Sequence, residues 1–329
     1  MKARRCPALL LALASALLVG CTAPTAPHPT PAGPPTPIRI VPAAQGTPAI
    51  LPPLGEITVL ARVNGEPIDA ETFGKELLRT ARLLTDRYGQ RIGWYSARSQ
   101  EQLPALRESV LEQLIDQELL RQLAQAEGFI IPTDQVEAAA AQAREEIVKT
   151  YGYSTWEEFL DAFLMTEEEF SRSVHANLLY RAMVVSHAGP TTVDQVHVQQ
   201  IVTHSEEEAQ DALERLNGGH EFAAVAQEVS VALVDHPDDL GRPLWLPRGI
   251  LPQALEDLAF SLPVGATGGP LQVESSFHIV RVLAHEPHPL EANVKDAYQT
   301  ARFGAWFGQQ KAQAQIERYV TFVPATPSP

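Results

Sequence analysis

The chain has 329 residues, of which 45% are hydrophobic, so it is long enough for two domains that each bury a core. Acidic residues outnumber basic ones by 40 to 25, and the formal net charge is −15. A negative protein repels phosphate backbones. We therefore expect no nucleic-acid partner.

Residues 1–20 are typical of a bacterial secretory signal peptide. A basic start precedes an apolar run from Ala8 to Val19 that is too short to span a bilayer comfortably. The run ends in LVGC at 18–21, which resembles a lipobox, so we expect cleavage before Cys21 and lipid on that cysteine. Cleavage would move the net charge from −15 to −18 by removing three basic residues, and would leave no second cysteine for a disulfide. The alternative is a plain signal peptide with a chance cysteine.

Residues 21–56 are rich in proline, alanine and threonine, as in TAPTAPHPTPAGPPTP. Such a composition builds no core and favours extended polyproline II structure. We expect a disordered tether that holds the folded part off a membrane. The anchored protein would be extracytoplasmic, on the cell membrane or the outer membrane, and the sequence does not choose between them.

Residues 57–190 are predicted to form mainly helices. ITVLARV (57–63) alternates as a strand does, Asn64-Gly65 is a tight-turn signal, and Asp69 can cap the next helix. Apolar residues at three-to-four spacing then predict a helix over 110–123 that Gly128 ends. A further helix begins at a Thr133 or Asp134 cap, and the sequence STWEEFLDAFLMTEEEFSRSVHANLLYRAMV supplies two more.

Three stretches of this region carry a family resemblance. ARVNGEPIDAETF, LEQLIDQELLRQLAQAEGFIIPTDQVEAA and TEEEFSRSVHANLL occur in the order found in the N-terminal helical domain of secreted foldases of the PrsA/SurA type. The resemblance implies a chaperone domain that holds unfolded, secreted polypeptides in an apolar cradle. The alternative is an unrelated small helical domain.

Residues 191–288 are predicted to alternate strands and helices. VHVQQIVT is a strand, and the next helix has Ser205 as its cap with Glu208 at the capping-box position. Two more helices follow in EFAAVAQEVS and LPQALEDLAFSL, and FHIVRVLAHE ends the region as a strand.

This second region resembles a parvulin-type (PpiC) prolyl isomerase domain along nearly its whole length. The matching positions are Gly219, Phe222, Ala226 and Ser230 in one helix, Asp239-Leu240-Gly241, Trp245-Leu246-Pro247-Arg248-Gly249, Leu255-Glu256, Ala259-Phe260, and Phe277-His278-Ile279-Val280. The resemblance implies an α+β fold in which a small antiparallel sheet with surrounding helices is inserted into the helical chaperone domain. It also places a proline pocket at Leu240, Leu251, Leu255 and Phe260.

The polar set implied by the resemblance is depleted. Parvulins typically carry a histidine where this chain has Gln200, and a threonine where it has Val273, while His278 and Ser275 remain. We take His278, Gln200 and Ser275 as the candidate catalytic residues, with Asp235 as a possible source of the missing acid. A lone strand histidine is also commonly structural, so His278 has that alternative.

Two further histidines, His197 and His204, receive no role, and scattered histidines without short spacing predict no metal site. We expect no cofactor.

Residues 289–329 are predicted to form a helix that returns to the chaperone domain, followed by a tail, because Phe303, Trp306 and Phe307 need a large surface to bury against. The alternative is an independent surface helix.

The predicted function is that of a peptidyl-prolyl cis-trans isomerase and chaperone for secreted proteins, with X–Pro segments as substrates and catalysis weakened by the depleted polar set. A parvulin-like holdase that only binds clients is the second hypothesis, and a structural envelope lipoprotein is the third.

Overall fold

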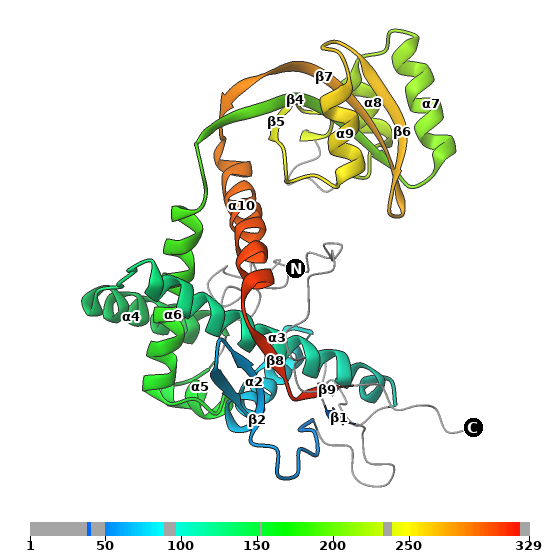
Figure 1. Ribbon diagram of the computed structural model, residues 1–329. Helices are drawn as coiled ribbons and strands as arrows, with labels where there is room; N and C mark the ends of the chain where they lie inside the picture. The colour runs from blue at the N-terminus through cyan, green and yellow to red at the C-terminus, as the bar shows by residue number, and fades with distance from the viewer. Residues whose placement is uncertain (1–37, 41–49, 89–96, 152, 233–238, 323–329) are drawn as a thin grey trace. The chain divides into compact units, whose positions relative to one another are not determined.

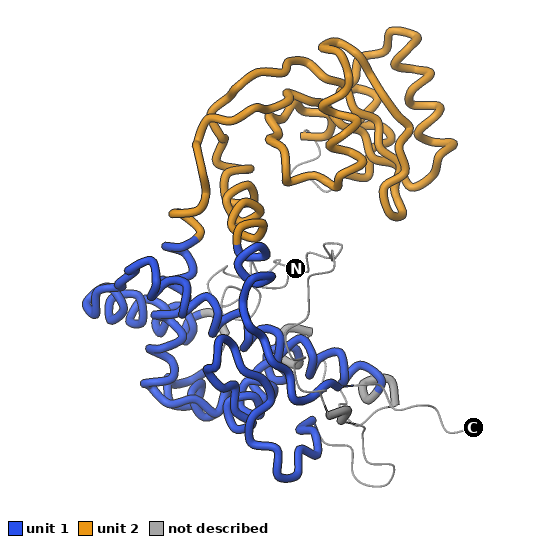
Figure 2. Tube along the Cα trace, in the orientation of Figure 1, with its two compact units in different colours: residues 1–183, 307–329 blue, residues 184–306 orange. Residues whose placement is uncertain are grey.

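The computed structural model describes residues 38–40, 50–88, 97–151, 153–232 and 239–322 (Figure 1). The chain divides into two compact units (Figure 2). Unit 1 comprises residues 1–183 and 307–329, and unit 2 comprises residues 184–306. Unit 2 is longer at both ends than the second region predicted from the sequence, which was 191–288. It also includes residues 184–190 and 289–306.

The helices of unit 1 follow the predicted order. They are α2 (Ala70–Tyr88), α3 (Ala97–Ala126), α4 (Thr133–Tyr151), α5 (Trp156–Ala162) and α6 (Glu167–Ser186), the last of which ends beyond the unit. Asp69 caps α2, because its carboxylate accepts a hydrogen bond from the Thr72 amide at 2.7 Å. Gly128 lies just beyond the end of α3 with φ +77°, a backbone conformation that glycine adopts without steric cost.

The aromatic core of unit 1 lies where α4, α5 and α6 meet. Trp156 packs edge-to-face on Phe170 with ring centroids 4.6 Å apart, and it stacks on Phe159 at 5.0 Å. Phe170 is 1% exposed. Burying such a side chain stabilises the fold by roughly 1.5–3 kcal/mol, so these rings fix the packing of the short helix α5.

The C-terminal segment of unit 1 packs beside its first strands. Strand β2 (Val59–Val63) pairs with β3 (Glu66–Asp69) on one side and with β8 (Ile316–Arg318) on the other. Lys311, near the end of α10 (Ala292–Gln313), forms ion pairs with Glu112 and Asp116 of α3. The rings of Phe322 and Phe73 stack at 5.4 Å.

The prediction of a disordered tether over 21–56 is wrong for part of that range. Ile38–Ile40 forms strand β1, which pairs in parallel with β9 (Val320–Phe322). The Arg107 guanidinium also donates hydrogen bonds to the Ile50 carbonyl at 2.9 and 3.0 Å. The reason is local: IRIV at 38–41 is a proline-free run of mostly β-branched residues, which can both donate to a ladder and favour extended backbone.

Unit 2 is built on a four-stranded antiparallel sheet in the order β5-β4-β7-β6. Its strands are β4 (Thr192–Thr203), β5 (Leu244–Pro247), β6 (Thr267–Val273) and β7 (Ser276–Pro289), and its helices are α7 (Glu206–Asn217), α8 (Phe222–Val229) and α9 (Gln253–Ser261). The predicted capping box is confirmed. The Ser205 side chain accepts a hydrogen bond from the Glu208 backbone amide, and the Glu208 side chain accepts one from the Ser205 backbone amide.

The two faces of this sheet carry different helices. Ile201 and Ile279, paired across β4 and β7, pack with α7 and α8. Val198 and Val280, which point to the other face, pack with α9 through Leu255 and Ala259. One face of the sheet is therefore covered by α7 and α8, and the other face is covered by α9.

Within the described ranges, no helix is both long and apolar enough to cross a bilayer. The predicted signal peptide (1–20), the lipid-anchor residue Cys21 and the C-terminal tail from 323 lie outside those ranges.

Candidate active site

The structure brings Gln200 and His278 together on the α9 face of the sheet. Gln200 pairs with Val280, and His278 pairs with Val202 on the neighbouring strand, so their side chains are diagonal neighbours on one face. The Gln200 Nε2 atom lies 2.8 Å from His278 Nδ1. The sequence predicted the two residues as separate members of the site, and the structure shows that they form one hydrogen-bonded pair.

This contact bears on the tautomer of the histidine. An amide nitrogen has protons but no free lone pair, so Gln200 donates and His278 Nδ1 accepts. The ring proton is then on Nε2, which is left to donate to another group. His278 is half-buried, and its burial lowers the pKa of the imidazole below its usual value, which favours the neutral ring.

Three of the four predicted pocket residues lie in the apolar cluster beside this pair. Leu255 is 3% exposed, and Leu251 and Phe260 pack around it as partly buried side chains. The Phe260 ring meets His285 edge-to-face with centroids 5.4 Å apart. The α9 face therefore carries both an apolar cluster and a polar pair.

Two charged residues that the sequence analysis did not single out for the site support Phe260. The Arg248 guanidinium lies 3.8 Å above the Phe260 ring centroid and 3.7 Å from the Glu256 carboxylate. Glu256 is 7% exposed, and it accepts a hydrogen bond from the Gly249 amide. The carboxylate thus ties the loop after β5 to α9. The family pattern contained both residues, but neither its spacing nor their types indicate this contact.

The structure places Leu240 and Ser275 apart from the polar pair. Leu240 packs against the cluster on the α7–α8 face of the sheet. Ser275 is exposed in the turn between β6 and β7, and no hydrogen bond between described residues links it to Gln200 or His278. Asp235, the possible acid, lies outside the described residues.

Among the described residues, no hydrogen bond links His197 or His204 to the polar pair of the candidate site. His197 stacks on Trp245 with centroids 4.6 Å apart, and His288 also stacks on that ring at 4.1 Å. His204 is exposed beyond the end of β4. Within the described part of the chain, no three His, Cys, Asp or Glu side chains gather as a metal site would require.

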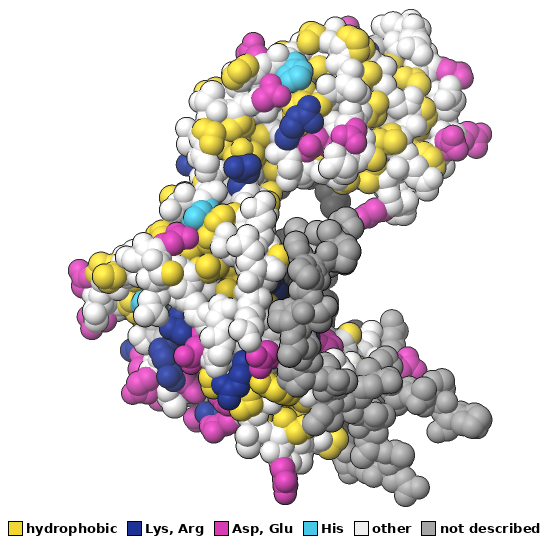
Figure 3. All heavy atoms as spheres, in the orientation of Figure 1, with side chains coloured by type: hydrophobic (Ala, Val, Ile, Leu, Met, Phe, Trp, Pro, Cys, Tyr) yellow, Lys and Arg dark blue, Asp and Glu magenta, His cyan; other side chains and the backbone are white. Residues whose placement is uncertain are grey.

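The surface shows no concentrated basic patch on the face drawn in Figure 3. There, Lys and Arg side chains lie interspersed with Asp and Glu side chains.

Two protein-family models match the chain in succession. Residues 52–184 match the SurA-like N-terminal domain, and residues 187–296 match the PPIC-type PPIASE domain. These matches confirm the predicted α+β fold class, with a helical region first and a small antiparallel sheet second.

The chain is also similar to individual proteins. The chain is 25% identical to a foldase protein PrsA from Caldanaerobacter subterraneus subsp. tengcongensis over 235 residues, which are 68% of this chain and 72% of that protein. It is 33% identical to a parvulin-like PPIase from Rickettsia bellii over 99 residues, 30% of this chain and 35% of that protein. A solved structure of peptidylprolyl isomerase (PrsA) from Bacillus anthracis aligns with a TM-score of 0.40 and 17% identity, covering 62% of this chain and 95% of that one.

Proposed function

We propose a function for a chain that carries a SurA-like N-terminal domain followed by a PPIC-type PPIase domain: it is an extracytoplasmic folding factor that isomerises X–Pro bonds and holds unfolded polypeptides. The observation that carries the isomerase half is the 2.8 Å contact of Gln200 with His278 beside the apolar cluster of α9. The related PrsA foldases and the SurA-like domain support the chaperone half.

The reaction needs selective binding of a twisted amide. Rotation about an X–Pro bond has a barrier of about 20 kcal/mol, because it breaks amide resonance, and no covalent bond is made or cut. A catalyst must therefore bind the twisted amide better than the planar one. An apolar pocket favours the twisted form by excluding the water that solvates the more polar planar amide.

Each residue of the site has a distinct role in this proposal. Leu251, Leu255 and Phe260 hold the proline ring. The His278 Nε2 proton donates to the carbonyl oxygen preceding the proline as the amide twists. Gln200 is a positioning residue, since its amide holds the imidazole in the tautomer that leaves Nε2 protonated.

A glutamine suits this role because no proton is transferred in the reaction. Gln200 can donate a hydrogen bond without titrating. Leu240 and Ser275 remain proposed contributors from the family resemblance alone, since Leu240 packs on the opposite face of the sheet and Ser275 lies on the β6–β7 turn.

Anchoring at the membrane is the second part of the proposal. Cleavage before Cys21 and lipidation of that cysteine would hold the protein outside the cytoplasm, beside newly secreted clients. The extracytoplasmic placing draws support from the relatives, among which is a periplasmic chaperone PpiD from Haemophilus influenzae, 37% identical over 101 residues.

A holdase without turnover is the second candidate function. It is favoured by the loss of polar groups from the parvulin pattern: glutamine at 200 and a valine at 273 that packs in the α9 cluster. Such a protein would bind X–Pro segments in the same pocket without accelerating their isomerisation.

Exchange NMR on a proline-containing peptide separates the two functions. We expect the full mature chain to accelerate cis/trans exchange, and His278→Ala to remove most of that acceleration. The matched control is His197→Ala, which alters a histidine of the same sheet on its opposite face. Binding of the peptide without any acceleration would establish the holdase, and a gain on Gln200→His would then identify the missing group.

A further inference from the structure

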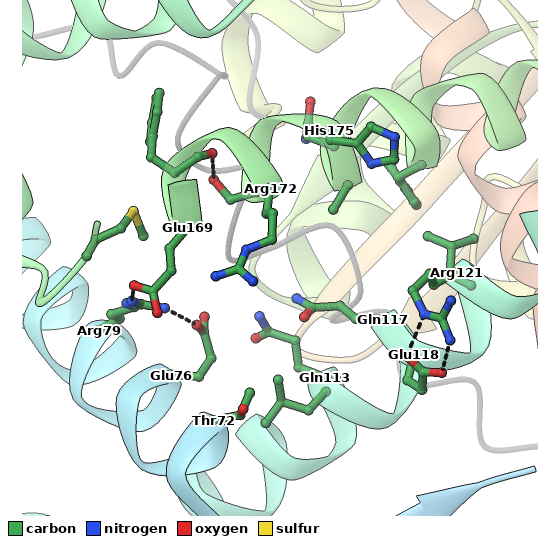
Figure 4. Close-up of a pocket in the computed structure, with 18 of the residues that line it drawn as sticks. Thr72, Glu76, Arg79, Gln113, Gln117, Glu118, Arg121, Glu169, Arg172 and His175 are labelled. Atoms are coloured by element: carbon green, nitrogen blue, oxygen red, sulfur yellow. Dashed lines mark hydrogen bonds and ion pairs between the residues drawn. The ribbon is translucent and has the colours of Figure 1, made fainter. Parts of the chain in front are cut away.

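A cavity of about 660 Å³ lies in unit 1 and shares no lining residue with the isomerase site. It is formed by β3, α2, α3, the end of α5 and α6 (Figure 4). Its volume falls in the range of pockets that bind small ligands or short peptide segments. The apolar part of its lining includes Leu114, Phe159, Phe170 and Leu179, which belong to the buried core of the unit.

Most charges around the cavity already have partners. Arg79 forms an ion pair with Glu169 at 2.5 Å and lies 3.6 Å from Glu76. Arg121 pairs with Glu118 at 2.7 Å. Burial raises the pKa of Glu76, and the nearby Arg79 opposes that rise.

Arg172 is the exception among the cations that line the cavity. Within the described part of the chain it makes no ion pair, and Glu168 on the preceding turn interacts with it only at longer range. Figure 4 shows its guanidinium directed into the space between α6 and α3. A cation placed there attracts an anionic group of whatever occupies the cavity.

Two amide side chains face the same space from α3. Gln113 and Gln117 are one helical turn apart, and they lie below Arg172 in Figure 4 with no dashed line to any neighbour. Neither makes a hydrogen bond among the described residues. A side-chain amide offers a donor and an acceptor, the two groups that a peptide backbone presents.

We propose that this cavity binds an extended client segment in which a large apolar side chain lies close to a carboxylate. The apolar side chain of the segment would contact Phe159 and Phe170 of the cavity lining. Gln113 and Gln117 would form hydrogen bonds with the backbone of the segment, and Arg172 would form an ion pair with its carboxylate. This rests on the proposed chaperone function and names the class of segment that unit 1 prefers.

The test uses two labelled peptides that lack proline, so that the isomerase pocket has no proline to bind. They share a sequence with Phe and Leu and differ only in Glu against Gln at one neighbouring position. Fluorescence anisotropy at low salt measures their affinity for the full mature chain, for Arg172→Gln, and for the control Arg181→Gln. Arg181 is exposed on the same helix and does not line the cavity.

We expect the Glu peptide to bind about three- to fivefold more tightly than the Gln peptide, since an exposed guanidinium contributes modestly. Arg172→Gln should abolish this preference, and Arg181→Gln should keep it. Equal affinities of the two peptides for the unaltered chain, or a preference that survives Arg172→Gln, would overturn the proposal.

Suppression of client aggregation, measured on the same samples, keeps the two proposals distinguishable. If the chain suppresses aggregation but shows no preference, the cavity proposal fails and the chaperone function stands. If it neither binds the peptides nor suppresses aggregation, both fail.

Discussion

The two units hold their polar groups in opposite ways. In unit 2, Gln200 and His278 bond to each other on neighbouring strands, so one arrangement is fixed before a substrate arrives. In unit 1, Arg172, Gln113 and Gln117 face a cavity, and their side chains make no hydrogen bond or ion pair with another described residue. The first arrangement suits recognition of one geometry, the twisted amide. The second suits loose recognition of composition in clients that differ in sequence.

The largest effect on stability is expected when a buried aromatic residue that lines the unit 1 cavity is replaced. Phe170→Ala removes a ring that is 1% exposed, and we expect the free energy of unfolding of unit 1 to fall by about 3–5 kcal/mol. Thermal unfolding followed by circular dichroism measures this loss. Isomerisation of a short peptide below the melting temperature should be unchanged. A parallel loss of both properties would show that the two units do not act separately.

The next effect concerns the isomerase pocket. Phe260→Ala removes both the half-buried ring and the surface under Arg248, so kcat/KM for a short X–Pro peptide should fall about tenfold to thirtyfold. Leu262→Ala is the matched control, because Leu262 packs in the same cluster just beyond α9. Equal losses in the two variants would mean that Phe260 acts only through packing.

A smaller effect is expected at Glu256. Glu256→Gln keeps an oxygen that can accept a hydrogen bond from the Gly249 amide, but it loses the negative charge beside Arg248. The free energy of unfolding should therefore fall by about 1–2 kcal/mol. Urea denaturation gives this value. Arg248→Gln should cost less than Glu256→Gln, because Arg248 is largely exposed while Glu256 is buried. The reverse order would contradict the proposed tie between the loop and α9.

The smallest effect is the pH dependence set by His278. Its folded-state pKa is lowered by burial, so the unfolded chain binds the proton more readily. Stability should therefore fall as the pH drops through the unfolded value of about 6.5, and cease to change below the folded value. His278→Gln should flatten this part of the stability curve. The rate of isomerisation should stay level between about pH 7 and 8, because the neutral ring persists there; a rate that rises steeply as the pH falls within that window would implicate the imidazolium.

Local signals were sufficient for much of the fold. Asp69, Ser205 with Glu208, and Gly128 predicted helix ends correctly, because caps depend on a few neighbouring residues. Strand β1 was missed because the surrounding prolines dominated the composition, and its partner β9 is far away in the sequence. Sequence distance concealed that pairing.

The candidate site was predictable in its residues but not in its contacts. The family pattern pointed to Gln200, His278, Leu251, Leu255 and Phe260, yet the hydrogen bond of the polar pair depends on the register of two strands about eighty residues apart. Leu240 packs on the α7–α8 face of the sheet, and Arg172 lines a cavity. Both positions depend on tertiary packing, which leaves no local pattern in the sequence.

A double-mutant cycle on the polar pair tests the central claim most directly. Exchange NMR would give the catalysed cis/trans rate of one X–Pro peptide for the full mature chain, His278→Ala, Gln200→Leu and the double variant. If Gln200 acts by positioning His278, the double variant should be no slower than His278→Ala alone. Losses that multiply would show that the two side chains act independently, and would contradict a site built on their contact.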